Sequence, residues 1–186
     1  MQQLAVLSAR LHDASPPLPT APPGALSARS VRYFDVPDLL SELPPPHRAV
    51  LTAARDRAAA AVEQLWQTSD TPPRLVHGDL TPSNVVAHRG QLSAIDFQDL
   101  SWAHVEQDLA HSIYGVTRGV DLAAGLTAFR AGYEQLRPWP QLDLALLTDL
   151  VAARRVSMVN LAVVGQRPGL AEYVERHADA LRFYLG

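Results

Sequence analysis

The sequence predicts an α+β fold that is mostly α-helical and contains one small β-ribbon. Apolar residues recur at helical spacing through most of the chain. Near the middle, two short apolar runs at residues 85–87 and 92–95 flank the turn-forming stretch 88–91, a pattern typical of a hairpin. At 186 residues the chain is one ordinary domain or a large fragment of one. The prediction therefore has a single domain, residues 1–186.

Helices are expected where the apolar period is clearest. The segment 48–66 gives the strongest signal, because it is rich in alanine and carries its larger apolar residues along one face. The first helix spans residues 3–14, so the chain begins directly in a helix. Glycine and proline residues separate the others. The remaining predicted helices are residues 105–114, 122–136, 142–164 and 171–184.

A proline-rich loop separates the first two helices. Residues 15–46 contain nine prolines, too many for a continuous helix or strand, although residues 38–43 could form a short helix. A loop of this length is usually either functional or loosely held. We therefore expect no long element between residues 15 and 46.

The segment with the clearest chemical content is residues 74–99. An apolar lead-in, Leu75-Val76, delivers His77-Gly78-Asp79 to a loop, and Asn84 starts the first strand of the predicted ribbon. Asp96 directly follows the second strand. Because a turn joins the two strands, we expect Asp79, Asn84 and Asp96 at one end of the ribbon.

These three side chains suit phosphoryl transfer, in which a protein positions an alcohol, orients a triphosphate and neutralises charge with a hard metal ion. Magnesium takes one or two protein oxygen ligands together with phosphate oxygens, so Asp96 and the amide oxygen of Asn84 form a suitable Mg²⁺ set. Asp79 is then left to act as the base towards the acceptor hydroxyl. Gly78 lets the loop pass close to neighbouring backbone.

Each candidate residue also has a structural interpretation. An Asp-x-x-x-x-Asn pair alone is common in turns, but His-Gly-Asp at its start and the later Ile-Asp-Phe favour a phosphotransfer site. His77 is either a hydrogen-bond partner that holds the loop, which is the favoured role, or a catalyst. Asp99 is either a carboxylate that supports the metal ligands or a turn residue. Asp108 lies near the start of a helix, where a carboxylate also offsets the helix dipole.

Three motifs carry a family resemblance: residues 77–84 (His-Gly-Asp-Leu-Thr-Pro-Ser-Asn), 95–99 (Ile-Asp-Phe-Gln-Asp) and 108–110 (Asp-Leu-Ala). Together they resemble the aminoglycoside phosphotransferase family and its homoserine-kinase and choline-kinase-like relatives, all of the protein-kinase-like fold. Leu11-His12 and residues 32–35 (Arg-Tyr-Phe-Asp) are similar to that family more weakly.

The resemblance implies that Asp79 is the catalytic aspartate and that Asn84 and Asp96 hold Mg²⁺. It also implies that Asp108 is a buried carboxylate bracing the catalytic loop. Protein kinases proper carry arginine at the position of Gly78, so small-molecule phosphorylation is the closer match.

The resemblance covers the chain as a C-terminal lobe only. Members of the family also carry an N-terminal lobe, whose loop covers the nucleotide phosphates and whose lysine contacts them. These 186 residues contain no lysine and no Gly-x-Gly-x-x-Gly pattern, so we expect the N-terminal lobe to be absent from them. A missing segment or a separate chain would supply it. The lobe alone is expected to bind nucleotide poorly and to self-associate through the surface beside the first helix.

Two hypotheses follow for the function. The first is a phosphotransferase that uses Mg²⁺ and ATP (or GTP) and transfers the γ-phosphoryl group to a hydroxyl of a small molecule. The second is a catalytically silent C-terminal lobe that acts as a binding or interaction module. A metal-dependent hydrolase is a weaker third hypothesis, because the His-rich cluster expected of a two-metal site is missing from the sequence.

The composition argues against several other classes. The net charge is -3, and no charge run indicates a partner such as nucleic acid or a membrane surface. The absence of cysteine excludes disulfides, thiolate metal sites and cysteine nucleophiles. No signal pattern and no apolar run of roughly 18 residues is present. We therefore expect a cytoplasmic protein.

Overall fold

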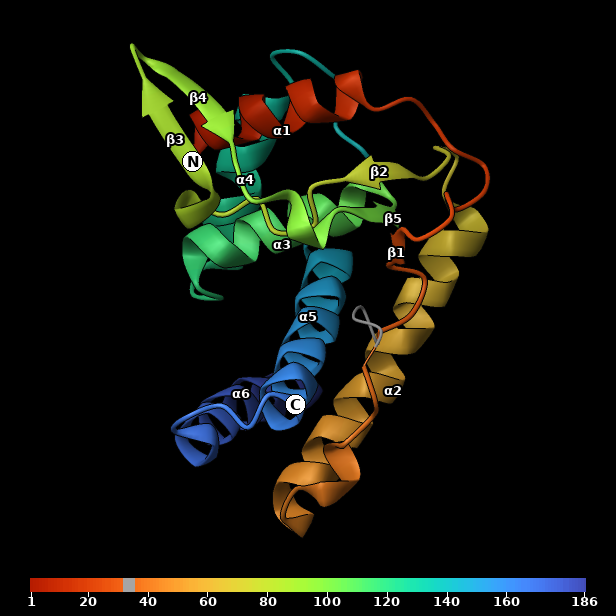
Figure 1. Ribbon diagram of the computed structural model, residues 1–186, viewed down its shortest axis with the longest axis vertical. Helices are drawn as coiled ribbons and strands as arrows, with labels where there is room; N and C mark the ends of the chain where they lie inside the picture. Colours follow the sequence, from red (N-terminus) through yellow and green to blue (C-terminus); the bar gives the residue numbers. More distant parts are fainter. Residues whose placement is uncertain (32–35) are drawn as a thin grey trace. The chain divides into compact units, whose positions relative to one another are not determined.

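A computed structural model of the chain describes residues 1–31 and 36–186 (Figure 1). The weakly family-like sequence at residues 32–35 lies outside the described residues. The chain divides into two compact units. The first unit contains Met1–Ala28 and Ser69–Leu147, and the second contains Arg29–Thr68 and Thr148–Gly186. All the predicted site residues therefore belong to the first unit.

Helices dominate the described residues, as predicted. Every predicted α-helix is present, with each end within three residues of its expected position, and the short helix expected at 38–43 is a 3₁₀ turn, Leu40–Glu42. None of the helices in the described part of the chain is long and apolar enough to cross a membrane. The α-helices are α1 (Gln2–Ala14), α2 (Pro45–Thr68), α3 (Val105–Thr117), α4 (Leu122–Tyr133), α5 (Leu144–Val164) and α6 (Leu170–Leu185).

The core of the first unit forms where α1 packs along α4, with α3 against both. Gly132 on α4 makes the close approach possible. A Cβ atom there would lie 2.5 Å from the Gln2 carbonyl oxygen and 2.9 Å from the Cβ of Ala5, closer than real Cβ contacts. The largest fully buried side chains in this core include Phe129, Tyr133, Leu109 and Ile113.

The predicted ribbon is an antiparallel hairpin of β3 (Val85–His88) and β4 (Gln91–Ala94), in which Val85 pairs with Ala94. Arg89 and Gly90 form its two-residue turn with φ angles of 49° and 77°. Two positive φ angles match the twist of a tight hairpin. The turn therefore fixes the register that brings the ends of β3 and β4 together.

A second sheet was missed by the prediction of a single ribbon. It has three short strands in the order β1 (Leu26–Ser27), β5 (Ser101–Ala103) and β2 (Arg74–Val76). β5 runs parallel to β1 and antiparallel to β2. All three residues of β5 are buried, so β5 has none of the apolar–polar alternation that predicts a strand. This sheet matters for the site, because β2 leads into the His77 loop and β5 leads into α3.

The proline-rich loop is tied to the sheet of the first unit at several points. The Leu18 amide donates to the Pro73 carbonyl at 2.7 Å, and the Trp102 indole donates to the Leu18 carbonyl at 2.8 Å. Further along, the Gln107 side-chain amide donates to the Ala28 carbonyl at 2.6 Å. This part of the loop is therefore held by specific hydrogen bonds.

The second unit is built on α2 and α6, which pack against each other. As predicted, α2 buries one apolar face. Its apolar contacts follow the 3.6-residue period of a helix that covers a core. The buried residues of α2 are Leu51, Ala54, Ala58, Val62 and Leu65, and those of α6 are Val174, His177, Ala178 and Leu181.

Candidate functional site

The His77-Gly78-Asp79 loop follows β2 and lies against α3. His77 and Gly78 are buried, while Asp79 is half-buried. Gly78 has a φ angle of +79°, a conformation that favours glycine over residues with a Cβ atom. The loop therefore turns sharply at Gly78 and presents Asp79 towards the surface.

Asn84 folds back onto Asp79. A 3₁₀ turn, Pro82–Asn84, brings the two residues together, and the Asn84 amide is bonded to the Thr81 carbonyl at 2.9 Å. The Asn84 side-chain Nδ2 donates to Asp79 Oδ2 at 2.9 Å and to the Asp79 carbonyl at 2.8 Å. The bond to Oδ2 orients the Asp79 carboxylate, and the bond to the carbonyl ties the Asn84 side chain to the backbone of the same residue.

Asp96 lies at the same end of the hairpin as Asn84. The Ile95 amide donates to the Asn84 carbonyl at 2.9 Å, which continues the β3–β4 pairing, and Asp96 is the next residue. Asp96 is exposed and has a φ angle of 62°, an uncommon left-handed conformation for a residue other than glycine. Such conformations often mark functional sites. The three predicted residues are thus gathered at one end of the hairpin, as expected.

The donor set fits a hard divalent cation. Because the Nδ2 atom of Asn84 is engaged by Asp79, the amide oxygen of Asn84 is the atom that remains for a metal. Together with the Asp96 carboxylate it provides two oxygen ligands, the number that Mg²⁺ usually takes from a protein. Within residues 1–31 and 36–186, no group of three or more His, Cys, Asp or Glu side chains is placed to hold a metal ion.

His77 connects its own loop to Ile95, the residue that precedes Asp96. Its Nε2 donates to the Ile95 carbonyl at 3.0 Å, and its Nδ1 accepts from the Asp79 amide at 3.3 Å. The imidazole ring also packs on Phe97, with 4.7 Å between ring centroids. This geometry agrees with the favoured interpretation of His77 as a loop-holding residue.

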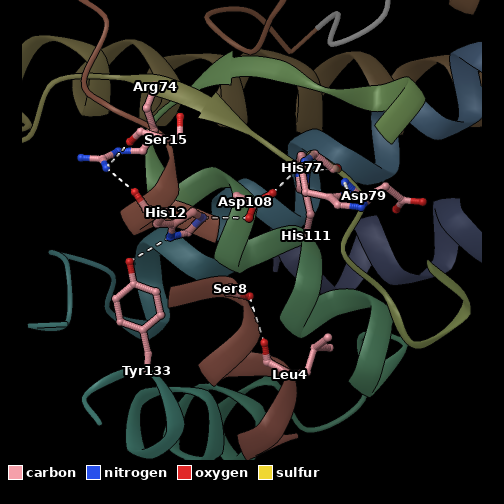
Figure 2. A network of polar contacts seen from close by, with 11 residues as sticks. Leu4, Ser8, His12, Ser15, Arg74, His77, Asp79, Asp108, His111 and Tyr133 are labelled. Atoms are coloured by element: carbon pink, nitrogen blue, oxygen red, sulfur yellow. Dashed lines mark hydrogen bonds and ion pairs between the residues drawn. The ribbon is translucent and has the colours of Figure 1, made fainter. Parts of the chain in front are cut away.

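Asp108 is buried, with 1% of its surface exposed, and braces the loop from α3. Its Oδ1 accepts the Gly78 amide at 2.7 Å, and its Oδ2 accepts Nε2 of His12 at 3.0 Å (Figure 2). Asp108 does not cap α3, because the His104 backbone amide at the start of that helix donates to the Gln107 side-chain oxygen. Burial alone would raise the pKa of Asp108. The hydrogen bonds from His12 and from the Gly78 amide outweigh that effect and hold the pKa of Asp108 below its ordinary value.

His111 holds the other side of Gly78. Its Nδ1 donates to the Gly78 carbonyl at 3.0 Å, so α3 binds both the amide and the carbonyl of this glycine. His111 lies outside the three motifs that carry the family resemblance. Its position three residues after Asp108 places both side chains on one face of α3, a spacing that could have suggested a joint role.

Two further buried charged groups lie beside this network. Arg74 donates to the carbonyls of His12 at 2.6 Å and Ser15 at 2.9 Å, which fastens the end of α1 to β2. Glu106 has 1% of its surface exposed, and its Oε2 has no hydrogen-bond partner among the described residues. Burial raises the pKa of Glu106, and a backbone hydrogen bond and the charge of Arg74 offset only part of this shift.

Asp99 closes the 3₁₀ turn Phe97–Asp99 and is half-buried. The turn is closed by the Leu100 amide, which donates to the Phe97 carbonyl at 3.1 Å. Asp99 is therefore a turn residue by position, and a supporting role for its carboxylate stays a prediction.

Comparison with known proteins gives one family match. The sequence model of a family described as the phosphotransferase enzyme family matches residues 1–139. The chain belongs to this family. The match includes every predicted site residue from His77 to Asp108. No curated protein matches the phosphotransferase chain significantly by sequence.

Several solved small-molecule kinases share the fold of this phosphotransferase chain. An amicoumacin kinase in complex with AMP-PNP and Ca²⁺ superposes with a TM-score of 0.67 at 20% identity, covering 96% of this chain and 58% of that one. A microcompartment-associated aminopropanol kinase gives a TM-score of 0.65 at 23% identity, covering 97% of this chain and 58% of that kinase. A glucosamine kinase in complex with glucosamine, ADP and inorganic phosphate gives 0.63 at 22% identity, covering 99% and 54%. The chain thus spans between about half and three fifths of the length of these kinases.

Proposed function

We propose that this phosphotransferase chain is the catalytic part of a small-molecule kinase, which transfers the γ-phosphoryl group of ATP or GTP to a hydroxyl group. Membership of the phosphotransferase family supports the reaction class. The observation that carries the proposal is the hydrogen bond from Asn84 Nδ2 to Asp79 Oδ2, 2.9 Å long. It lies at the end of the hairpin at which the chain continues from β4 to Asp96.

In this proposal Asp79 takes the proton of the acceptor hydroxyl. The hydroxyl oxygen forms a bond to the γ-phosphorus, and the bond from that phosphorus to the leaving nucleoside diphosphate breaks. Asn84 orients the Asp79 carboxylate through Oδ2. The amide oxygen of Asn84 and the carboxylate of Asp96 would hold Mg²⁺, which neutralises phosphate charge when bound.

The acceptor we propose is an amino alcohol or amino sugar, within the aminoglycoside, homoserine and choline kinase-like range. The solved kinases of the same fold support this choice, because their names specify amicoumacin, aminopropanol and glucosamine. The nucleotide would also need a covering lobe, either from a further segment of the protein or from a separate chain. The 186 residues contain no lysine that could contact the nucleotide phosphates.

Nucleotide turnover tests this proposal. The chain, together with its nucleotide-covering lobe, is incubated with Mg²⁺, ATP or GTP and a panel of acceptors headed by aminopropanol and glucosamine. Wild-type protein should release nucleoside diphosphate, and Asp79→Asn should lower kcat by about 10²–10⁴-fold, the usual contribution of a general base.

Asp143→Asn is the matched control, because the exposed Asp143 side chain accepts the Leu146 amide at the start of α5. It should leave turnover unchanged. Equal turnover in wild type and Asp79→Asn would remove Asp79 as the base, and no turnover in any protein would favour the silent-lobe hypothesis.

A further inference from the structure

Three buried side chains from three helices lie in a line that ends at the catalytic loop (Figure 2). The Tyr133 hydroxyl on α4 lies 2.8 Å from Nδ1 of His12 on α1, and Nε2 of His12 lies 3.0 Å from Asp108 on α3. The other Asp108 oxygen accepts the Gly78 amide at 2.7 Å. Tyr133, His12 and Asp108 each have no more than 1% of their surface exposed. The line therefore connects α4 to the residue next to Asp79 without passing through solvent.

The hydrogen bonds define where the protons of this line lie. An ionised carboxylate only accepts hydrogen bonds, so Nε2 of His12 must carry the proton that faces Asp108. In a neutral imidazole Nδ1 is then an acceptor, and the Tyr133 hydroxyl is the donor placed at it. Burial raises the pKa of Tyr133 to about 12, so the hydroxyl keeps its proton at neutral pH. The nearby Arg137 guanidinium offsets part of this rise in the Tyr133 pKa.

We propose that Tyr133 is a positioning residue for the catalytic loop: its hydroxyl fixes His12 in the Nε2–H form, and His12 in turn orients the Asp108 carboxylate that holds the Gly78 amide. The consequence for catalysis rests on the proposed function, since it concerns the placing of Asp79. The coupling between Tyr133 and Gly78 is a property of the fold and holds whether or not the chain turns over.

The loss of the hydroxyl has a defined effect. Without it, Nδ1 of His12 is a buried acceptor with no donor, and the ring can relieve this only by moving its proton to Nδ1 or by rotating. Moving the proton turns a lone pair of Nε2 towards Asp108, and rotating the ring lengthens the hydrogen bond between Nε2 and Asp108. Asp108 then loses the partner that orients it against Gly78, whose amide becomes less protected.

Tyr133→Phe tests the proposal with little change of packing. The phenylalanine ring retains the edge-on contacts with His12 and Trp139, whose centroids lie 5.7 and 5.6 Å away. Tyr184→Phe is the matched control, because the Tyr184 hydroxyl donates to Asp149 at 2.6 Å in the second unit. Both variants remove one hydrogen-bonded hydroxyl from a partly or fully buried tyrosine.

Two measurements report the coupling without any need for activity. The ¹⁵N shifts of His12 should show an unprotonated Nδ1 and a protonated Nε2 in wild type and in Tyr184→Phe, and a changed pattern in Tyr133→Phe. Hydrogen exchange of the Gly78 amide should accelerate by about tenfold in Tyr133→Phe, the size expected when one buried hydrogen bond is lost, and should not change in Tyr184→Phe. In the Asp108→Asn background, Tyr133→Phe should have no further effect on Gly78 exchange.

The proposal is overturned if wild-type His12 carries its proton on Nδ1 or on both nitrogens, a result that needs no variant. It is also overturned if Gly78 exchange is the same in Tyr133→Phe, Tyr184→Phe and wild type, or if the effects of Tyr133→Phe and Asp108→Asn simply add. For an active protein with its covering lobe, Tyr133→Phe should lower kcat about tenfold and leave the KM for nucleotide within twofold. A protein without turnover would count against the kinase proposal, while the ¹⁵N and exchange results would still decide the coupling.

Discussion

Replacing the buried Asp108 with asparagine should destabilise the first unit more than the same substitution at an exposed aspartate. In the native protein both Asp108 oxygens accept hydrogen bonds, from the Gly78 amide at 2.7 Å and from His12 at 3.0 Å. Asparagine keeps one oxygen but puts an NH₂ group at the other position. One of the two donors is therefore left facing another donor in a site that excludes water.

The magnitude follows from those two contacts. A hydrogen bond to a charged group contributes about 1.5–3 kcal/mol, and leaving a buried donor unsatisfied costs about 1–3 kcal/mol. Removing one partner of a buried charged pair typically costs about 3–5 kcal/mol. We expect Asp108→Asn to lose about 3–5 kcal/mol, a large part of the roughly 5–15 kcal/mol that stabilises an ordinary domain.

The assay is urea denaturation at pH 7, followed by far-UV circular dichroism. Asp143→Asn provides the control, because Asp143 is exposed and asparagine caps a helix about as well as aspartate. This control should change the free energy of unfolding by less than about 0.5 kcal/mol. An Asp108→Asn loss below about 1 kcal/mol, or one no larger than that of the control, would refute the bracing role of Asp108.

The pH dependence provides a second check on the same variant. The pKa of Asp108 is below its ordinary value of 3.8 in the folded protein, so its carboxylate contributes stability that is fully present above about pH 3.8. That contribution is lost as the pH falls through the lower, folded-state pKa. The difference in stability between wild type and Asp108→Asn should therefore persist above about pH 3.8 and shrink in strong acid.

Two other substitutions give predictions of opposite sign. Glu106→Gln removes a buried carboxyl whose pKa burial raises above 4.5, so it should raise Tm at pH 7 by roughly 2–4 °C, about 1 kcal/mol, and have little effect near pH 4. A lower Tm of Glu106→Gln than of wild type at pH 7 would show that other groups stabilise the Glu106 carboxylate charge. Gly115→Ala places a Cβ 2.4 Å from the Thr81 Cγ2 atom, in the loop between Asp79 and Asn84, so overpacking of about 1–3 kcal/mol should exceed the helix-propensity gain of roughly 1 kcal/mol. A more stable Gly115→Ala protein in urea denaturation would show that the loop yields at no cost.

The hairpin and its three polar residues could be predicted because their signals are local. The runs of apolar residues on either side of Arg89 and Gly90 define the strands, and the site residues directly follow or precede them. Motif spacing then places Asp79 and Asn84 in one loop. Helices were predictable for the same reason, since an apolar period over 12 or more residues is a strong signal.

The three-stranded sheet could not be predicted in the same way. β1 has two residues and β5 has three, too few to show an alternating pattern, and β1 lies in the proline-rich loop. The pairing of Leu26 with Ser101 joins residues far apart in the sequence. Only the folded chain brings these segments together.

The bracing network was also beyond sequence analysis for the most part. Asp108 was expected through the family resemblance, and His12 belonged to a weaker motif. The bond between His12 and Tyr133 links positions 121 residues apart, and no local pattern marks either residue as its partner. A single histidine or tyrosine on an apolar helix face predicts burial, but not the hydrogen bond that satisfies its polar atom.

The most direct test of the whole account is the place where a divalent cation binds. Mn²⁺ titrated into ¹⁵N-labelled protein with nucleotide and the covering lobe should broaden the backbone signals of Asn84 and Asp96 first, and Asp96→Ala should weaken Mn²⁺ affinity by at least about tenfold. Glu172→Ala, a substitution at an exposed acidic position on α6, should leave the Mn²⁺ affinity unchanged. Broadening centred on α6 or elsewhere, with unaltered affinity in Asp96→Ala, would contradict the proposal that Asn84 and Asp96 share one ion beside Asp79.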